Sequence, residues 1–216
     1  VTIRNCRYAS NSAVVRGGGL GCIGSTISVF DCTFENNHAA TGGGMWWDDY
    51  RSGTGVLSGC VFKNNTADYD GGGLARDYGE HSIVHCEFRN NAAAGNGGAV
   101  FSYREYSTFA NCSFVGNLAE LGGAVGAYQG NPLFVNCTMS GNVATDAGGA
   151  ANAFGSFNAI TLRNCTVAGN VADNVGGLRG SLGGMAATNC IVWWNRDGTG
   201  EGQVAQVGYV GAIEYS

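Results

Sequence analysis

The sequence has very little proline and little charge: one Pro among 216 residues, with charged residues at 12%. Lys and Arg number only 11 against 16 Asp and Glu, so the basic face that nucleic-acid binding requires is missing. No apolar run approaches the roughly 20 residues that span a bilayer, so we expect no transmembrane segment. A disordered Gly-rich tract is excluded as well, because 44% hydrophobic residues suffice for a buried core.

Glycine is abundant, with 38 residues, and short apolar stretches separate the glycines and asparagines. This composition is typical of all-β structure with frequent tight turns. There are nine cysteines but no C-x-x-C pair, so neither a zinc site nor a compact disulfide framework is indicated. We expect the cysteines to be free thiols that behave as small apolar core residues.

Eight of the nine cysteines recur at intervals of 25 to 28 residues and mark an internal repeat, at Cys6, Cys32, Cys60, Cys86, Cys112, Cys137, Cys165 and Cys190. Five residues after each of them stands an asparagine, namely Asn11, Asn37, Asn65, Asn91, Asn117, Asn142, Asn170 and Asn195. A large apolar residue follows each cysteine by two positions, and an alanine follows seven of the eight by seven positions. Such spacing predicts that like residues stack in columns, with the asparagines forming a hydrogen-bonded amide ladder.

The residue just before each cysteine is Asn, Asp, Gly or His, the types that best tolerate positive φ, so a bend is expected there. Each repeat is predicted to run as a strand, this bend, a second strand, the Asn turn, a buried alanine, a Gly turn and a third strand. The fold class is therefore an all-β, right-handed parallel β-helix (solenoid) of about eight rungs. We expect residues 1–216 to form a single β-helix domain and a segment of a longer chain, with a ninth repeat starting near residue 212.

Two short motifs resemble a known family. Phe34-x-x-Asn37 and Phe62-x-x-Asn65 match FxxN, and Gly97-Gly98-Ala99-Val100 matches GGA-[ILV]. The pattern resembles the repeats of chlamydial polymorphic outer membrane proteins and, more widely, secreted bacterial right-handed β-helix proteins. The resemblance implies an extracellular or cell-surface passenger used for adhesion, surface coating or carbohydrate contact.

Aromatic and charged residues gather after the Gly turn of successive repeats, and stacking would bring them onto one face. We expect a carbohydrate-binding strip formed by Trp47, Tyr50, Tyr78, Tyr103, Arg104 and Tyr128. Three acids on successive rungs, Asp49, Asp77 and Glu105, are candidate ligands for Ca²⁺, the one cofactor that we consider. The alternative is a solvated face on which acids and arginines pair across the rungs.

These observations favour a non-catalytic structural or adhesive β-helix module, secreted or at the cell surface, that assembles into larger surface structures or filaments. Its expected partners are other copies of itself or surface proteins, and glycans. The alternative is a carbohydrate-binding or polysaccharide-degrading protein of the pectate-lyase kind. We assign no catalytic residue, because Asp48-Asp49 is the one adjacent acid pair and the G-H-G and R-I-K motifs of polygalacturonases are missing.

Overall fold

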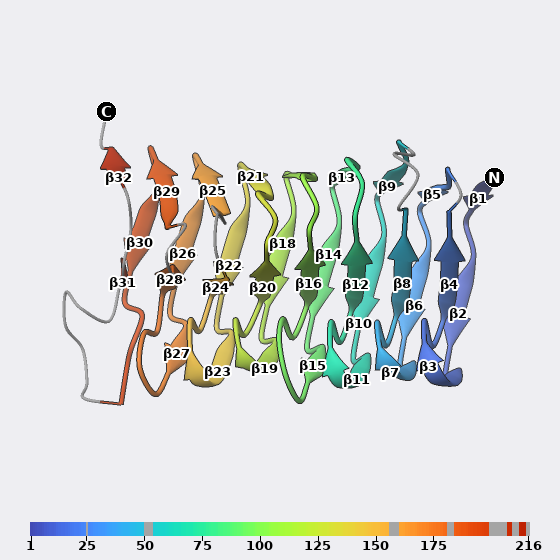
Figure 1. Ribbon diagram of the computed structural model, residues 1–216, viewed down its shortest axis with the longest axis horizontal. Coiled ribbons are helices and arrows are strands. Elements are labelled where there is room, and N and C mark those ends of the chain that lie inside the picture. Colours follow the sequence, from blue (N-terminus) through green and yellow to red (C-terminus); the bar gives the residue numbers. More distant parts are fainter. Residues whose placement is uncertain are drawn as a thin grey trace.

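The computed structural model describes residues 1–24, 26–49, 54–155, 160–180, 184–198, 207–208 and 212–214. The regular structure of these residues is entirely β, arranged as four parallel sheets of nine, eight, seven and eight strands (Figure 1). The strands of each sheet follow one another along a rod, with residue 1 at one end and the last rungs at the other. Nowhere in the described part of the chain is there a helix of the length and apolarity needed to cross a membrane.

The four sheets are named here A to D in the order in which the chain visits them. Sheet A contains β1 (Thr2–Arg4), β5 (Ser28–Phe30), β9 (Val56–Ser58), β13 (Ser82–Val84), β17 (Thr108–Ala110), β21 (Leu133–Val135), β25 (Ile160–Arg163), β29 (Met185–Thr188) and β32 (Ala212–Glu214). Sheet B contains β2 (Arg7–Ala9), β6 (Thr33–Glu35), β10 (Val61–Lys63), β14 (Glu87–Arg89), β18 (Ser113–Val115), β22 (Thr138–Ser140), β26 (Thr166–Ala168) and β30 (Ile191–Trp193). Sheet C contains β3 (Ser12–Arg16), β7 (His38–Thr41), β11 (Thr66–Asp70), β15 (Ala92–Ala93), β19 (Leu118–Leu121), β23 (Val143–Ala147) and β27 (Val171–Ala172). Sheet D contains β4 (Leu20–Ile23), β8 (Met45–Asp48), β12 (Leu74–Asp77), β16 (Val100–Tyr103), β20 (Val125–Tyr128), β24 (Ala151–Phe154), β28 (Leu178–Gly180) and β31 (Val207–Gly208).

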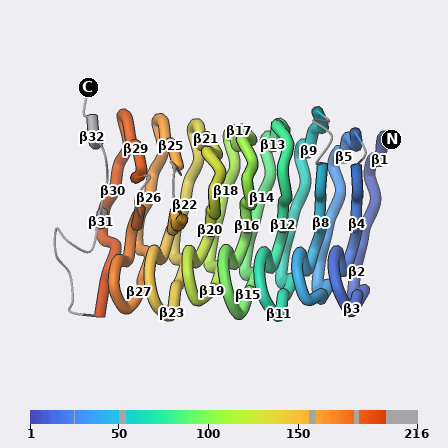
Figure 2. The backbone as a smooth tube through the Cα atoms, in the orientation of Figure 1, coloured from blue at the N-terminus to red at the C-terminus, as the bar shows by residue number. Residues whose placement is uncertain are grey.

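Each of the first seven circuits contributes one strand to each sheet, so neighbours within a sheet differ by four in strand number. In the described part of the eighth circuit sheet C has no strand, so β31 and β32 differ by three from their neighbours β28 and β29. The tube in Figure 2 shows successive circuits lying side by side along the rod. This is the predicted right-handed parallel β-helix, and the repeat boundaries lie where the cysteine intervals placed them. At the far end, β32 pairs with β29 in the same parallel register, with Ile213 opposite Ala187.

The rung has four strands where the sequence predicted three. The alanine column, expected to lie between two turns, forms the short strands of sheet C, with Ala67 opposite Ala39 and Ala93. These segments are only two to five residues long, too short for periodicity to reveal them, yet their backbone groups bond to the next rung. At the following corner glycine is required, because a Cβ on Gly43 would stand 2.2 Å from the Thr66 carbonyl oxygen.

The predicted bend before each cysteine is present in all eight rungs. Every residue at this position has a positive φ between 52° and 64°, in the order Asn5, Asp31, Gly59, His85, Asn111, Asn136, Asn164 and Asn189. The bend changes the direction in which side chains alternate, so that the apolar residues of sheets A and B both point into the core. It explains why the residues three positions before the cysteines are buried together with the cysteines, as Leu57 and Cys60 are.

Stacked side chains fill the core between the sheets. The rings of Phe34 and Phe62 lie parallel with centroids 4.6 Å apart, and Phe88 and Phe114 continue the row at 4.9 and 5.0 Å. All nine cysteines are free thiols, as predicted, and six of the eight in the repeat column are buried. Cys22, outside that column, is half-buried in β4, and burial raises the pKa of its thiol to about 11.

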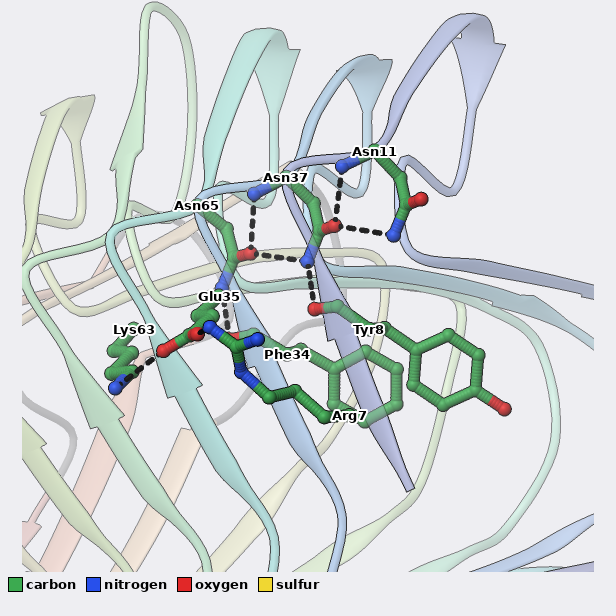
Figure 3. Close-up of polar contacts among 8 residues, drawn as sticks. All are labelled: Arg7, Tyr8, Asn11, Phe34, Glu35, Asn37, Lys63 and Asn65. Carbon is green, nitrogen blue, oxygen red and sulfur yellow. Dashed lines mark hydrogen bonds and ion pairs between the residues drawn. The ribbon is translucent and has the colours of Figure 1, made fainter.

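The asparagine column is a continuous ladder of amides (Figure 3). Asn37 Oδ1 accepts hydrogen bonds of 3.0 Å from both the backbone and the side chain of Asn11, while its Nδ2 donates to Asn65 Oδ1 and to the Tyr8 carbonyl. The pattern repeats rung by rung to Asn195. From Asn37 onward the ladder asparagines are at most 1% exposed. The hydrogen bonds to the neighbouring rungs therefore satisfy side-chain amides that water does not reach.

A charged ladder runs beside it on sheet B. The Glu35 carboxylate, 5% exposed, lies between the guanidinium of Arg7 on the preceding rung and the ammonium of Lys63 on the following one (Figure 3). Opposite charges on adjacent rungs thus add to the forces that hold successive rungs together.

Replacing one central ladder residue tests how much the amides contribute. In Asn91→Ala, the backbone N–H and side-chain amide of Asn65 lose their acceptor inside the core, and we expect a loss of about 3 kcal/mol in unfolding free energy. Urea unfolding measures it. The control is Asn11→Ala at the exposed first rung, for which we expect a loss below about 1 kcal/mol. Equal losses in the two variants would contradict the ladder's role.

Candidate functional site

The corner between sheet D and sheet A carries unusual side chains. The D strands end in register at Asp77, Tyr103, Tyr128 and Phe154. On each of these four rungs the next residue has a positive φ. At Tyr78 it is 60°, which is uncommon for a bulky residue. Backbone strain of this kind clusters at functional sites.

Aromatic rings continue from rung to rung along this corner. The rings of Tyr78 and Tyr103 meet edge to face at 5.9 Å, and those of Tyr103 and Tyr128 stack at 5.5 Å. Arg104 lies beside this tyrosine row, with its Cζ 5.2 Å from the Tyr103 ring centroid and its Nε donating to Gln129 Oε1 at 2.7 Å. The tyrosine row is therefore a partly exposed aromatic surface, and the guanidinium of Arg104 is held beside it.

An open pocket of about 400 Å³ adjoins the tyrosine row. It draws its lining from three successive rungs, namely Asp49, Thr54, Tyr78, Gly79, Glu80, Arg104 and Tyr106. Two aromatic rings, two carboxylates and a guanidinium thus surround one space. This mixture of apolar surface with a few polar groups is typical of small-ligand sites.

A buried polar cluster lies next to the pocket and is organised by one guanidinium. Arg76, fully buried on β12, donates to Glu105 Oε2 at 3.0 Å and also bonds to Ser107 Oγ and His81 Nδ1. Glu105 is held further by the Ser107 backbone N–H at 3.0 Å and by Ser102 Oγ at 2.6 Å. We call this group, together with Asp49, the Arg76 cluster.

The cluster reaches the pocket through His81 and Asp49. His81 Nε2 lies 3.4 Å from Asp49 Oδ2, and the His81 ring packs against Trp47 with centroids 4.0 Å apart. Burial, followed by the charge of Arg76, lowers the pKa of His81 to about 3, so the imidazole is neutral at physiological pH. Gly79 leaves room for that ring, since a Cβ there would stand 2.3 Å from His81 Cε1.

The structure assembles part of the predicted sugar-binding strip. Tyr78, Tyr103, Arg104 and Tyr128 lie together at the corner, as stacking required. Trp47 was expected on this surface but is fully buried, because it points to the same, core-facing side of β8 as Met45. Tyr50 lies outside the described residues.

The three acids proposed as calcium ligands do not gather at one point. Among the described residues no three His, Cys, Asp or Glu side chains form a group able to hold a metal ion. Glu105 is fully buried and bonded to Arg76, Asp49 belongs to the pocket wall, and Asp77 lies at the end of β12, where burial raises the pKa of its carboxyl. Glu105 does pair with an arginine of the neighbouring rung, but inside the core and not on the solvated face that was the alternative interpretation.

Sequence reasoning missed the interior role of Arg76 and His81. The signal for Arg76 was present: Leu74 and Arg76 occupy the same register positions as Met45 and Trp47, so alternation along β12 places Arg76 in the core. An arginine followed by aspartate and tyrosine nevertheless suggested a solvated loop. For His81 there was no such signal, because it follows an irregular corner.

A family profile described as a right-handed β-helix region matches residues 18–199. The chain belongs to the right-handed β-helix family. No curated protein sequence matches this β-helix significantly. The profile covers all of the corner residues described above. It describes the fold and assigns no chemistry to the pocket.

The neutral buried His81 predicts a specific loss of stability in acid. Its folded-state pKa lies below the unfolded value near 6.5, so the unfolded chain takes up the proton first as the pH falls, and stability decreases from about pH 6.5 toward about pH 3. We expect the unfolding free energy of the wild type, relative to His81→Gln, to fall by about 2 to 3 kcal/mol between about pH 7 and 4.5.

Urea unfolding of both proteins across this range provides the measurement. His38→Gln is the matched control, because His38 is a partly exposed histidine on sheet C, outside the Arg76 cluster. An acid dependence that is the same in wild type and His81→Gln would show that His81 does not titrate in this way.

Proposed function

We propose that this β-helix is a non-catalytic structural and adhesive module, secreted or held at a cell surface, and that it adheres by binding carbohydrate. The pocket and the tyrosine row beside it carry the proposal. Aromatic rings stack on the apolar faces of sugar rings, while carboxylates and guanidiniums bond to hydroxyl groups. Tyr78, Tyr106 and Arg104 bring these groups together around one space.

The geometry of the row suits an extended ligand. Because Tyr78, Tyr103 and Tyr128 stand on consecutive rungs, their rings repeat every 5.5 to 5.9 Å along the rod. A polysaccharide laid parallel to the axis would meet one aromatic ring per rung. The likeness of the repeats to those of chlamydial polymorphic outer membrane proteins supports a surface location, with glycans, other copies of the chain or surface proteins as partners.

A polysaccharide-degrading function is the alternative, and the presence of Asp49 and Glu80 in one pocket with Arg104 favours it over other enzymatic readings. A two-carboxylate glycosidase needs a matched acid and base on either side of the bond to be cleaved. Release of new reducing ends from a bound polysaccharide would support this alternative and contradict the non-catalytic module.

The binding proposal predicts the effect of removing the exposed rings. We expect Tyr78→Ala combined with Tyr103→Ala to weaken binding to the best ligand of a glycan array at least about tenfold, because the stacking surface is lost. The array is run with and without Ca²⁺, which tests calcium as a cofactor. The folded state of the variant is checked by urea unfolding.

Tyr69→Ala is the matched control, since Tyr69 is a tyrosine on β11 of sheet C that is more exposed than Tyr78, at the opposite end of the rung's cross-section (Figure 1). It should bind as the wild type does. Binding that survives the loss of both Tyr78 and Tyr103, or no binding of the wild type to any glycan, would rule out the tyrosine row as the adhesive surface.

A further inference from the structure

Among the described residues, the buried part of the site has more negative than positive charge. Arg76 is the one cation of the Arg76 cluster, and its guanidinium is paired with the Glu105 carboxylate at 3.0 Å. Asp49 is the second carboxylate, and its neighbour His81 is neutral. One positive charge thus faces two negative ones, and the charge left over resides on Asp49.

Asp49 also has a hydrogen-bonding deficit. It is 1% exposed, yet in the described part of the chain its Oδ2 accepts no hydrogen bond, since the contact of 3.4 Å to His81 Nε2 does not have the geometry of one. A buried carboxylate without a donor or a full counter-charge is costly to the folded protein. Because Asp49 lines the pocket, a cation bound there would supply the counter-charge that the carboxylate lacks.

The remaining walls of the pocket also favour a cation. Glu80 adds a second carboxylate, and Tyr78 and Tyr106 offer ring faces that attract positive charge. The cation of the pocket, Arg104, is held by Gln129 and by the Tyr103 ring, and in the described part of the chain it forms no ion pair with Asp49 or Glu80. The two acids are therefore not neutralised by it.

We propose that this pocket selects a protonated amino sugar, with the ammonium group at Asp49 and Glu80 and the sugar ring against Tyr78 and Tyr106. The inference rests on the proposed carbohydrate-binding function and names the substrate class. Arg76 and His81 act as positioning residues that hold Asp49 in place. The tyrosine row continues from the pocket along the rod, which fits a polymer of sugar rings better than an isolated lysine side chain.

Calorimetric titration of the full 216-residue chain with two matched ligands tests the proposal. One is a short β-linked glucosamine oligomer at about pH 6, where its amino groups are protonated. The other is the same oligomer fully N-acetylated, which has no charge. We expect the amino form to bind at least about tenfold more tightly, and a lysine oligopeptide of equal charge to bind more weakly than either.

Removal of the pocket's negative charge should abolish the preference selectively. In Asp49→Asn the ratio of the two affinities is expected to fall to about threefold or less, while binding of the N-acetylated oligomer is kept. Glu80→Gln is the second variant; its exposed side chain can be changed without risk to folding, and we expect it to reduce the ratio about threefold. Asp68→Asn, an exposed acid on sheet C, is the charge-matched control and should leave the ratio unchanged.

The outcomes separate the two proposals. If neither oligomer nor any other glycan binds, the carbohydrate-binding function itself fails. If both oligomers bind with equal affinity, or if Asp49→Asn and Glu80→Gln keep the wild-type ratio, carbohydrate binding stands and the amino-sugar preference is wrong. A lysine peptide that binds as tightly as the amino oligomer would likewise overturn it, in favour of a protein partner.

Discussion

The register between successive rungs is the constraint on which the rest of this β-helix depends. Parallel backbone hydrogen bonds alone tolerate slippage, because every residue offers the same donor and acceptor. The buried asparagine removes that freedom. Its amide has four partners, which lie on the rung before and the rung after, and all four are satisfied only when asparagine lies over asparagine. A slip of one residue would bury unpaired amides throughout the ladder.

The same register explains how a functional corner can be built from a repeat. Columns that stack like on like, such as phenylalanine and cysteine, leave little room for variation. The corner between sheets D and A is free of that requirement, and there the rungs differ: aspartate, tyrosine and arginine follow one another at equivalent positions. Because the ladder aligns the rungs, residues 25 to 31 positions apart, such as Arg76 and Ser107, meet reliably. The pocket is thus assembled from three rungs without any long-range loop.

The contrast between the repeated columns and the variable corner explains how much of the structure could be predicted from the sequence. Fold, bends and ladder were predictable, because a column seen eight times averages out local ambiguity. The tyrosines and Arg104 could be brought together for the same reason, since equivalent positions stack. Trp47 was wrongly expected at the surface, because two acids follow it in the sequence. The alternation of side chains along the strand decides otherwise: Trp47 lies two residues after Met45, and Arg76 two residues after Leu74, so both side chains point into the core. The contact between His81 and Asp49 lies beyond such reasoning, because it depends on an irregular corner that occurs once.

A buried arginine paired with a buried glutamate needs a physical reason, because desolvating charges often costs more than their attraction returns. A hydrophobic residue at this position of β12, between β8 and β16, would have filled the space at a lower desolvation cost. What Arg76 adds is orientation: its bonds to Glu105, Ser107 and His81 fix three side chains from neighbouring rungs, and His81 in turn stands against Asp49. The pocket wall is therefore set before any ligand arrives. A ligand that binds there loses little affinity to ordering the protein, since the rungs are already rigid, and its gain comes from the charge that the fold leaves uncompensated at Asp49.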